Sequence, residues 1–281
     1  MAISAADVKR LRDDTDAPMM ECKAALEEAG GDFEKAKAIL REKGKAAATK
    51  RAGRSTAAGV VAMSRSHNHK AAGAIVLECE TDFVARNEEF IAVAQELAEI
   101  FMHNAPGSDP LAISHGNKNV GQIIEECVAK FRENTRLAKV VHLEGDNLLA
   151  TYVHHDRTKG AIVELTGPEE AALDAGHKVA IQCVAFPPEA VRKEELSQER
   201  LATELATEKQ RAMNEGKPEE IAEKIAQGRV NKEFINQVVL LEQPFYADPS
   251  KTVGAFVAEH AKAAGGAIEV VKFHYFAVGQ E

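Results

Sequence analysis

An internal repeat constrains the fold of this 281-residue chain more than any other feature of its sequence. The tetrapeptide GAIV occurs at residues 73–76 and again at 160–163, each time inside an apolar, β-branched run that follows a similar run. Runs of this kind, separated by short polar stretches, predict two β-hairpins. A helical pattern follows each hairpin; it begins at a Glu-Glu pair, at Glu88 or Glu169, and reaches a proline eighteen positions later.

Two further pairs of segments match in the same order. KNVGQIIEECVAK from Lys118 matches KTVGAFVAEHAKA from Lys251, and VVHLEG near Val140 matches VVKFHYF near Val270. Single matches are common, whereas four in one order indicate a repeat. The pattern predicts an α+β protein with two related β-β-α-α-β core subdomains, in which antiparallel sheets carry helices on one face.

The first 44 residues have the pattern of a three-helix bundle. Ser4 is placed to cap the first helix together with Asp7, Pro18 to open the second, and Asp32 to cap the third. Gly30 and Gly31 would close the second helix, and Gly44 would end the third. A bundle this small is better suited to docking than to catalysis.

The second half of the repeat contains about fifty extra, charge-rich residues. Ser197 is placed to cap one helix, Gly216 to end it and Pro218 to start another, so we predict a helical hairpin. Its apolar stripe is narrow, which favours a projection that meets a partner or a second copy of the chain over one that folds back onto its own domain. That stripe consists of Leu196, Leu201, Leu205, Ile221, Ile225 and Phe234.

These patterns predict five segments. They are a docking bundle at 1–44, a basic linker at 45–56, core subdomain one at 57–146, core subdomain two at 147–187 and 237–281, and the inserted hairpin at 188–236.

The two halves also differ by six residues where a strand leads into a helix. From GAIV to the Glu-Glu pair the first half takes fifteen residues and the second takes nine. The difference equals the length of TDFVAR, residues 81–86, so the fold closes without this segment and its presence suggests a function. The segment puts a large apolar ring, Phe83, on a surface connection. The alternative is that Phe83 packs on its own helix and Asp82 only caps that helix.

Motifs for catalysis, cofactors or metals were sought and not found in the sequence. It has no P-loop, no GxGxxG after a strand and no GxSxG. The four cysteines are far apart, so we expect buried free thiols. His67 and His69 lack further metal ligands, and His154 with His155 is more typical of a surface or partner contact than of a general base. We therefore expect a protein that binds another protein, not an enzyme.

Charge and composition restrict the partners. The net charge is −9 and only 5% of residues are aromatic, which argues against nucleic-acid binding. KGKAAATKRAGR at residues 43–54 is a local basic exception, and it leaves a ribosome- or RNA-associated protein as the alternative. No apolar run is long enough to cross a membrane, and the amphipathic beginning does not resemble a signal peptide. We expect a cytoplasmic protein.

Several segments resemble, in order, those of the bacterial translation elongation factor Ts family. They are LRDDTDAPMMECKAAL at 11–26, CETDFVARN at 79–87, EGKPEEIAEKIAQGR and QPFYADPSKTVG. The resemblance implies a guanine-nucleotide exchange factor that binds GDP-bound elongation factor Tu, disturbs its magnesium and phosphate site, and releases GDP so that GTP can bind. It also implies a ubiquitin-associated-like bundle, two related core subdomains and an inserted coiled coil, with no cofactor or metal of its own and a possible homodimer through the hairpin.

The resemblance also assigns residues. It implies that Thr81, Asp82, Phe83 and Val84 dislodge the magnesium ion of the partner. Further partner contacts are implied at Arg12, Met19, Met20, Lys23, Arg51, Phe131, His154 and Tyr246. The chain departs from the family pattern at three of the nearby positions: Pro18 replaces a glycine, Glu80 stands where many members carry glutamine, and Ala247 is smaller than usual.

Overall fold

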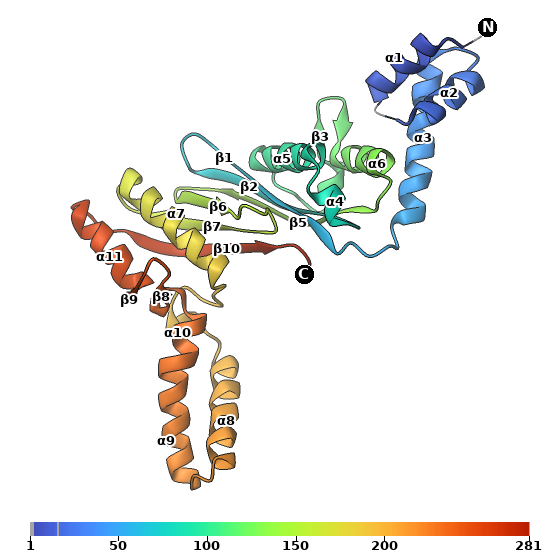
Figure 1. Ribbon diagram of the computed structural model, residues 1–281. Helices are drawn as coiled ribbons and strands as arrows, with labels where there is room; N and C mark the ends of the chain where they lie inside the picture. The colour runs from blue at the N-terminus through green and yellow to red at the C-terminus, as the bar shows by residue number, and fades with distance from the viewer. Residues whose placement is uncertain (1–2, 16, 281) are drawn as a thin grey trace. The chain divides into compact units, whose positions relative to one another are not determined.

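The computed structural model describes residues 3–15 and 17–280, the side chain of residue 47 excepted (Figure 1). It is a mixed α+β protein with N-terminal helices and several small sheets, which confirms the predicted class. The chain divides into two compact units. Unit 1 holds residues 1–64, 72–143 and 276–281, and unit 2 holds residues 65–71 and 144–275.

Unit 1 begins with three helices whose caps match the sequence signals. They are α1 (Ala5–Thr15), α2 (Met19–Glu28) and α3 (Phe33–Arg51). The backbone N–H of Asp7 donates to Ser4 Oγ at 3.1 Å, and the Ser4 N–H donates back to the Asp7 carboxylate at 3.3 Å. Asp32 accepts from the backbone N–H of Lys35 at 3.1 Å. The buried core of the bundle is Val8, Leu11, Cys22, Ala25, Leu26, Ala36 and Leu40.

The prediction that Gly44 ends the third helix is wrong. Helix α3 runs on to Arg51 because AAATKR is rich in strong helix formers and no proline interrupts it. Gly44 lies where α3 packs on α6 (Val120–Phe131): a Cβ built on it would come 3.5 Å from Ala129 Cβ. Most of the predicted basic linker is therefore helical.

The rest of unit 1 is built on a three-stranded sheet with the order β1-β2-β5. The central strand β2 is buried over nearly its whole length, because α5 and α6 cover the sheet and supply Phe90, Leu97 and Ile123 to the same core. The elements are β1 (Ala58–Arg65), β2 (Ala71–Cys79), α4 (Asp82–Ala85), α5 (Glu88–His103), η1 (Pro110–Ala112), β3 (Ser114–His115), β4 (Lys118–Asn119), α6 and β5 (Thr135–Glu144).

Unit 2 has a second three-stranded sheet, in which β7 lies between β6 and β10. Strands β6 and β7 are antiparallel, with Leu148 opposite Leu165 and Val153 opposite Gly160. Helix α7 packs across both strands (Figure 1). The elements are β6 (Leu148–Val153), β7 (Lys159–Thr166), α7 (Glu169–Ala185), β8 (Pro244–Phe245), β9 (Asp248–Thr252), α11 (Val253–Ala263) and β10 (Glu269–Ala277).

The same arrangement recurs at the positions that the predicted repeat aligns. In each sheet the second strand of the first hairpin is central and pairs with the last strand of the half. A two-stranded ribbon precedes α6 and another precedes α11. Even one ion pair is repeated: Lys118 Nζ lies 2.5 Å from Glu126 Oε2, and Lys251 Nζ lies 2.5 Å from Glu259 Oε2.

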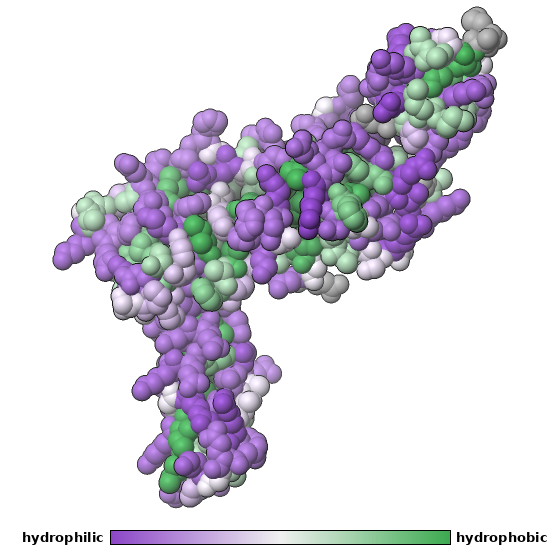
Figure 2. Space-filling view, viewed as in Figure 1, coloured by the Kyte–Doolittle hydropathy of each residue, from purple (hydrophilic) through white to green (hydrophobic). Residues whose placement is uncertain are grey.

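The inserted segment of unit 2 is a helical hairpin that extends away from the sheet of that unit and does not fold back onto it (Figure 1). Its surface is mostly hydrophilic (Figure 2). Helices α8 and α9 meet through small side chains, Ala212, Ala222 and Ala226, whereas Ile221 of the predicted stripe is 49% exposed. The elements are η2 (Lys193–Glu195), α8 (Gln198–Asn214), α9 (Glu219–Arg229), a π-helical turn (Val230–Phe234), α10 (Ile235–Val238) and η4 (Leu240–Glu242).

Larger apolar side chains gather only at the root of this hairpin. Leu196, Val230, Phe234, Ile235 and Val239 form a separate buried cluster there. None of the helices in residues 3–15 and 17–280 combines the length and the apolar character that crossing a bilayer requires.

Candidate partner-binding site

The six extra residues of the first half form a short helical turn. Strand β2 ends at Cys79 and α5 begins at Glu88, which leaves eight residues between them, and α4 occupies four of these. Between β7 and α7 there are only two residues, Gly167 and Pro168. The difference of six residues is the one that the repeat predicts, and the second half has no counterpart of α4.

The turn presents the ring of Phe83 to solvent. Phe83 is 84% exposed, the largest value among the exposed large apolar residues of the described chain. Its neighbours hold the turn down: Val84 packs against the core of unit 1, and Ala85 is buried. Thr81, not Asp82, caps the turn, since its hydroxyl lies 3.5 Å from the Val84 N–H. The alternative in which Phe83 packs on its own helix and Asp82 caps it is wrong in both parts.

Asp82 stays on the surface beside the ring. Its carboxylate forms an ion pair with Arg86 one turn later at 3.3 Å, and both side chains are more than half exposed. An exposed pair of this kind contributes little to stability, so the carboxylate is free to exchange Arg86 for polar groups of a partner.

Two carboxylates fasten the turn to the segment between α6 and β5. Glu133 Oε2 accepts from the Thr81 N–H at 2.9 Å, and Glu133 Oε1 accepts from the Thr81 hydroxyl at 2.6 Å. In the opposite direction, Glu80 Oε1 accepts from the Asn134 N–H at 2.7 Å. Each segment therefore supplies the acceptor for the other, and the turn has a defined position before any partner binds.

The charge of Glu80 has a structural reason. The Asn134 N–H bond and the nearby Arg54 guanidinium, 3.4 Å away, hold the pKa of the Glu80 carboxyl below its usual range. A glutamine at this position could accept the same N–H bond but would lack the attraction to Arg54.

A third carboxylate, Glu78, belongs to the buried strand β2 that leads into the turn and is 1% exposed. It accepts from Arg136 at 2.7 Å and 3.1 Å, from the Thr56 hydroxyl at 2.8 Å and from the Gly279 N–H at 3.2 Å. Burial raises the pKa of Glu78, but these bonds outweigh it and hold the pKa below the usual range.

Sequence reasoning missed Glu78 and Glu133. Their partners are 22 to 201 residues away, so no local spacing identifies them. The only available signal was a charged residue at the end of the apolar run GAIVLEC.

The predicted contacts of the bundle lie on its surface. Met19 is 45% exposed and Met20 is 74% exposed, both at the start of α2, where Pro18 precedes the first helical residue. Arg12 and Lys23 are also exposed. An unbranched apolar side chain held out by a rigid helix is typical of an adaptable docking surface.

Two other predicted contacts of unit 1 are more deeply placed. Arg51, the last residue of α3, is half-buried. Phe131 is also half-buried, and the edge of its ring meets Phe90 at a centroid distance of 5.7 Å. Part of Phe131 therefore belongs to the core, and only the remainder is available to a partner.

At least three of the five cations of the basic stretch have carboxylate partners. Lys43 lies 2.7 Å from Glu28, Lys45 lies 3.4 Å from Glu42, and Arg54 pairs with Glu80. Carboxylates that neutralise these cations reduce the attraction to phosphates, which disfavours the RNA-binding alternative.

The remaining predicted contacts belong to unit 2. His154 is half-buried in the turn after β6, and its Nδ1 lies 2.9 Å from Tyr152 Oη; His155 is exposed. Tyr246 is 37% exposed between β8 and β9, and its backbone N–H donates to the buried Gln182 at 2.8 Å.

Comparisons with known proteins agree with this arrangement. A family model described as Elongation factor TS matches residues 80–280. Elongation factor Ts of Aquifex aeolicus (strain VF5) is 40% identical, with 99% of both chains covered. The proteins of the same name from Chloroherpeton thalassium (strain ATCC 35110 / GB-78) and Nitratidesulfovibrio vulgaris (strain DP4) are 40% and 37% identical, and each alignment covers at least 97% of both chains. The chain therefore belongs to the elongation factor Ts family.

Proposed function

We propose that this protein is the nucleotide exchange factor for elongation factor Tu in translation elongation, and that Phe83 carries the step that loosens GDP. The family assignment supports the activity. One observation supports the role of the ring: Phe83 is 84% exposed on a turn whose backbone is fixed by Glu133 and that the second half of the repeat lacks. Such a ring can enter an apolar slot of the partner with little rearrangement.

Exchange of this kind needs differential binding and no bond-making group. The factor must bind nucleotide-free elongation factor Tu better than the GDP-bound form, and GDP then weakens the factor by the same ratio. Burying one large apolar side chain contributes about 1.5–3 kcal/mol. A 10⁴-fold effect requires roughly 5.5 kcal/mol, so other contacts must contribute.

We assign different tasks to these contacts. The exposed methionines Met19 and Met20, with Arg12 and Lys23, anchor the partner. Thr81, Asp82, Phe83 and Val84 act on the nucleotide site, where Asp82 competes for polar contacts around the partner's magnesium ion. Arg51, Phe131, His154 and Tyr246 add affinity. The exposure of Met20 and Phe83 supports this division, because only the most exposed side chains are available without rearrangement.

We also propose the finer organisation of the chain. The N-terminal helices form a ubiquitin-associated-like bundle, and the two sheets with their helices are related core subdomains, as their equal strand order and repeated Lys–Glu pair suggest. The hairpin is a coiled coil that meets either the partner or a second copy of the chain, in the cytoplasm. Sedimentation of the chain alone, with and without residues 198–229, tests self-association, and a monomer in both cases would exclude the second copy.

The function is tested by the release of a fluorescent GDP analogue from elongation factor Tu. We expect the protein to accelerate release, Phe83→Ala to lose most of the acceleration, and Leu111→Ala to retain it. Leu111 is a matched control, since it is an apolar side chain of the same unit that is 45% exposed. Absence of acceleration by the unmodified protein would contradict the exchange function, and full acceleration by Phe83→Ala would contradict the role of the ring.

A further inference from the structure

We propose that Glu133 is a positioning residue for nucleotide exchange: its carboxylate holds the turn that presents Phe83, so that the ring is oriented before the partner arrives. This inference rests on the proposed role of Phe83. Glu133 is not a residue of the turn itself, and it lies 50 positions further along the chain than Phe83.

The turn cannot hold its own shape. Helix α4 has only four residues, and a helix this short lacks the bonds that would offset its ordering entropy. Its cap, Thr81, is fixed from outside: both Glu133 oxygens accept from it, at 2.9 Å from the backbone N–H and 2.6 Å from the hydroxyl. The hydroxyl oxygen in turn accepts from the Val84 N–H at 3.5 Å. Phe83 thus lies between two residues, Thr81 and Val84, that a series of hydrogen bonds connects to Glu133.

The hydrogen bonds from Thr81 to Glu133 are stronger than the capping bond from Val84 to Thr81. Hydrogen bonds to an ionised acceptor are shorter and stronger than neutral ones, and the hydroxyl bond of 2.6 Å is in the range for a charged acceptor. The capping bond of 3.5 Å is long. Loss of the carboxylate therefore removes the strongest side-chain hydrogen bonds of the turn. The long Val84 cap, the backbone bonds of α4 and the packing of Val84 and Ala85 remain, so the turn stays attached but is less well ordered.

The segment that carries Glu133 is fixed on both sides. Arg132, which caps the C-terminus of α6 with φ 58°, forms an ion pair with Glu21 of α2. On the other side, the Asn134 N–H donates to Glu80, and the Asn134 side chain donates to the carbonyl of Arg54 at 2.8 Å. A carboxylate on a fixed segment gives its partner a fixed direction, which is what a positioning residue requires.

Preorganisation of the turn matters for rate more than for binding of the ground state. A mobile turn would have to be ordered as the ring enters the nucleotide site, and that entropy would be lost at the step that loosens GDP. Affinity contributed by the exposed methionines of the bundle would be unaffected. Loss of the Glu133 carboxylate is therefore expected to lower the maximal exchange rate and to leave the half-saturating concentration unchanged.

The test measures GDP-analogue release over a concentration series of the factor. We expect Glu133→Ala to lower the maximal rate by roughly tenfold, the effect of losing a charged hydrogen-bond acceptor, with half-saturation unchanged. Glu126→Ala is the matched control, because Glu126 forms an exposed ion pair in the same unit without touching the turn. In the Phe83→Ala background, Glu133→Ala should cause a much smaller further loss, since its main effect is to orient the Phe83 side chain.

A second readout does not depend on exchange. The Thr81 amide should exchange its hydrogen faster in Glu133→Ala, whereas the Ile91 amide of α5, which donates to Asn87 within the same unit, should not change. Uniformly faster exchange across unit 1 would indicate general destabilisation and overturn the positioning role. If the alanine variant does not fold, Glu133→Gln, which keeps one of the two acceptor oxygens and loses the charge, should still lower the maximal rate and leave half-saturation unchanged.

The outcomes separate the two proposals. A normal maximal rate in Glu133→Ala together with a lowered maximal rate in Phe83→Ala would overturn the positioning role of Glu133 alone. Equal additional loss from Glu133→Ala with and without the Phe83 ring would also overturn it. A normal maximal rate in Phe83→Ala would overturn the role of the Phe83 ring and, with it, the positioning role of Glu133.

Discussion

At the scale of single residues, Glu78 is a buried carboxylate whose loss of hydration is offset by hydrogen bonds. Taking a carboxylate out of water costs free energy unless charged or polar donors satisfy it. Arg136, Thr56 and the Gly279 N–H donate to Glu78, so this carboxylate can remain charged inside strand β2. Removing that charge leaves three donors with a poorer acceptor.

We therefore predict that Glu78→Gln lowers the free energy of unfolding at pH 7 by about 1–2 kcal/mol, a modest value because Arg136 is half exposed. The folded-state pKa of Glu78 is depressed, so its contribution is present above the unfolded pKa and is lost as the pH falls through the folded pKa. Denaturant titrations of both proteins at pH 7 and below pH ~4 check this. An equal difference at both pH values would contradict the charge as its cause.

Gly73 in the first GAIV allows α5 to approach the central strand. A Cβ on it would lie 2.2 Å from the Ala98 carbonyl oxygen and 2.3 Å from the Met102 nitrogen, both backbone atoms that cannot rotate away. We predict that Gly73→Ala destabilises unit 1 by about 1–3 kcal/mol through overpacking. Gly53→Ala serves as control, since nothing lies within 4 Å of its Cβ position. A denaturation midpoint unchanged by Gly73→Ala would contradict this close packing.

Some site residues could be predicted from local sequence and others could not. Phe83 was identifiable because its segment has no counterpart in the second half of the repeat. Glu133 was not, since its role depends on tertiary contact with Thr81, 52 residues away. That Thr81 rather than Asp82 caps the turn also required the backbone geometry, because both residue types favour this position.

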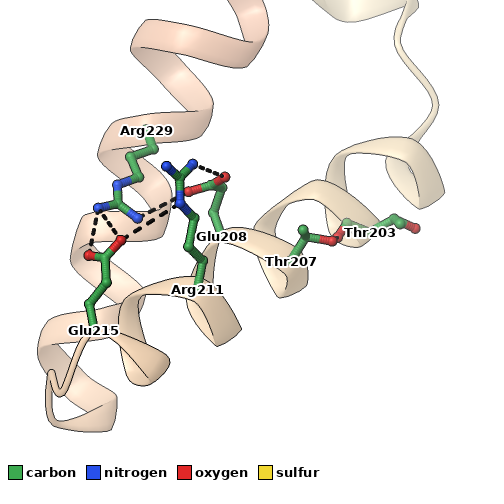
Figure 3. Close-up of polar contacts among 6 residues, drawn as sticks. All are labelled: Thr203, Thr207, Glu208, Arg211, Glu215 and Arg229. Atoms are coloured by element: carbon green, nitrogen blue, oxygen red, sulfur yellow. Dashed lines mark hydrogen bonds and ion pairs between the residues drawn. The ribbon is translucent and has the colours of Figure 1, made fainter.

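At the scale of elements, the helical hairpin is held by charge at its end, where apolar side chains are small. Arg229 of α9 reaches across to α8, where its guanidinium lies 3.2 Å from Glu208 and 2.8 Å from Glu215 (Figure 3). Arg211 on α8 contacts the same two carboxylates but is 60% exposed. The pKa of Glu215 is held below its usual range chiefly by the bonds from Arg229.

We predict that Arg229→Ala loosens the end of the hairpin without unfolding the rest of unit 2. Hydrogen exchange of residues 206–228 should become several-fold faster, because one bridge between the two helices is lost. The ion pairs of Lys209 with Glu219 and Glu223 and the alanine contacts remain, so the helices stay paired. Arg211→Ala, which removes contacts within α8 only, should have a smaller effect. Equal acceleration by both variants, or acceleration that extends to β6 and β7, would contradict the bridging role.

The elements themselves followed the sequence where caps and breakers act locally. Ser4, Asp32, Ser197 and Pro218 begin helices as predicted, since a cap depends on the next three residues. Gly44 was misjudged because its context is tertiary: the helix continues past it and packs on α6. The alanine seam of the hairpin was likewise not evident from the positions of Leu and Ile.

At the scale of the whole molecule, the repeat predicted two sets of similar elements but not how their strands are ordered. The structure gives both sheets the same order, with the second strand of the hairpin in the centre. The four cysteines lie in buried positions as free thiols, as their wide spacing predicted. Burial raises the pKa of Cys79, Cys127 and Cys183 to about 12 and also raises that of Cys22.

We predict that none of the four thiols reacts readily in the native protein at pH 8. A buried thiol with a raised pKa is inert, since the thiolate is the reactive form. Labelling by a maleimide should follow unfolding: Cys79 and Cys127 report on unit 1, and Cys183 reports on unit 2. Mass spectrometry of the labelled peptides across a denaturant series checks this. Fast labelling of any of these residues in the absence of denaturant would contradict the buried environment.

The proposed mechanism separates two roles: the bundle anchors the partner and the ring of Phe83 loosens the nucleotide. The most direct test is the rate of GDP-analogue release from elongation factor Tu as a function of factor concentration, for Met20→Ala and Phe83→Ala in parallel. We expect Met20→Ala to raise the half-saturating concentration and retain the maximal rate, whereas Phe83→Ala should lower the maximal rate and leave half-saturation nearly unchanged. Equal loss of both quantities in both variants would contradict this separation of roles.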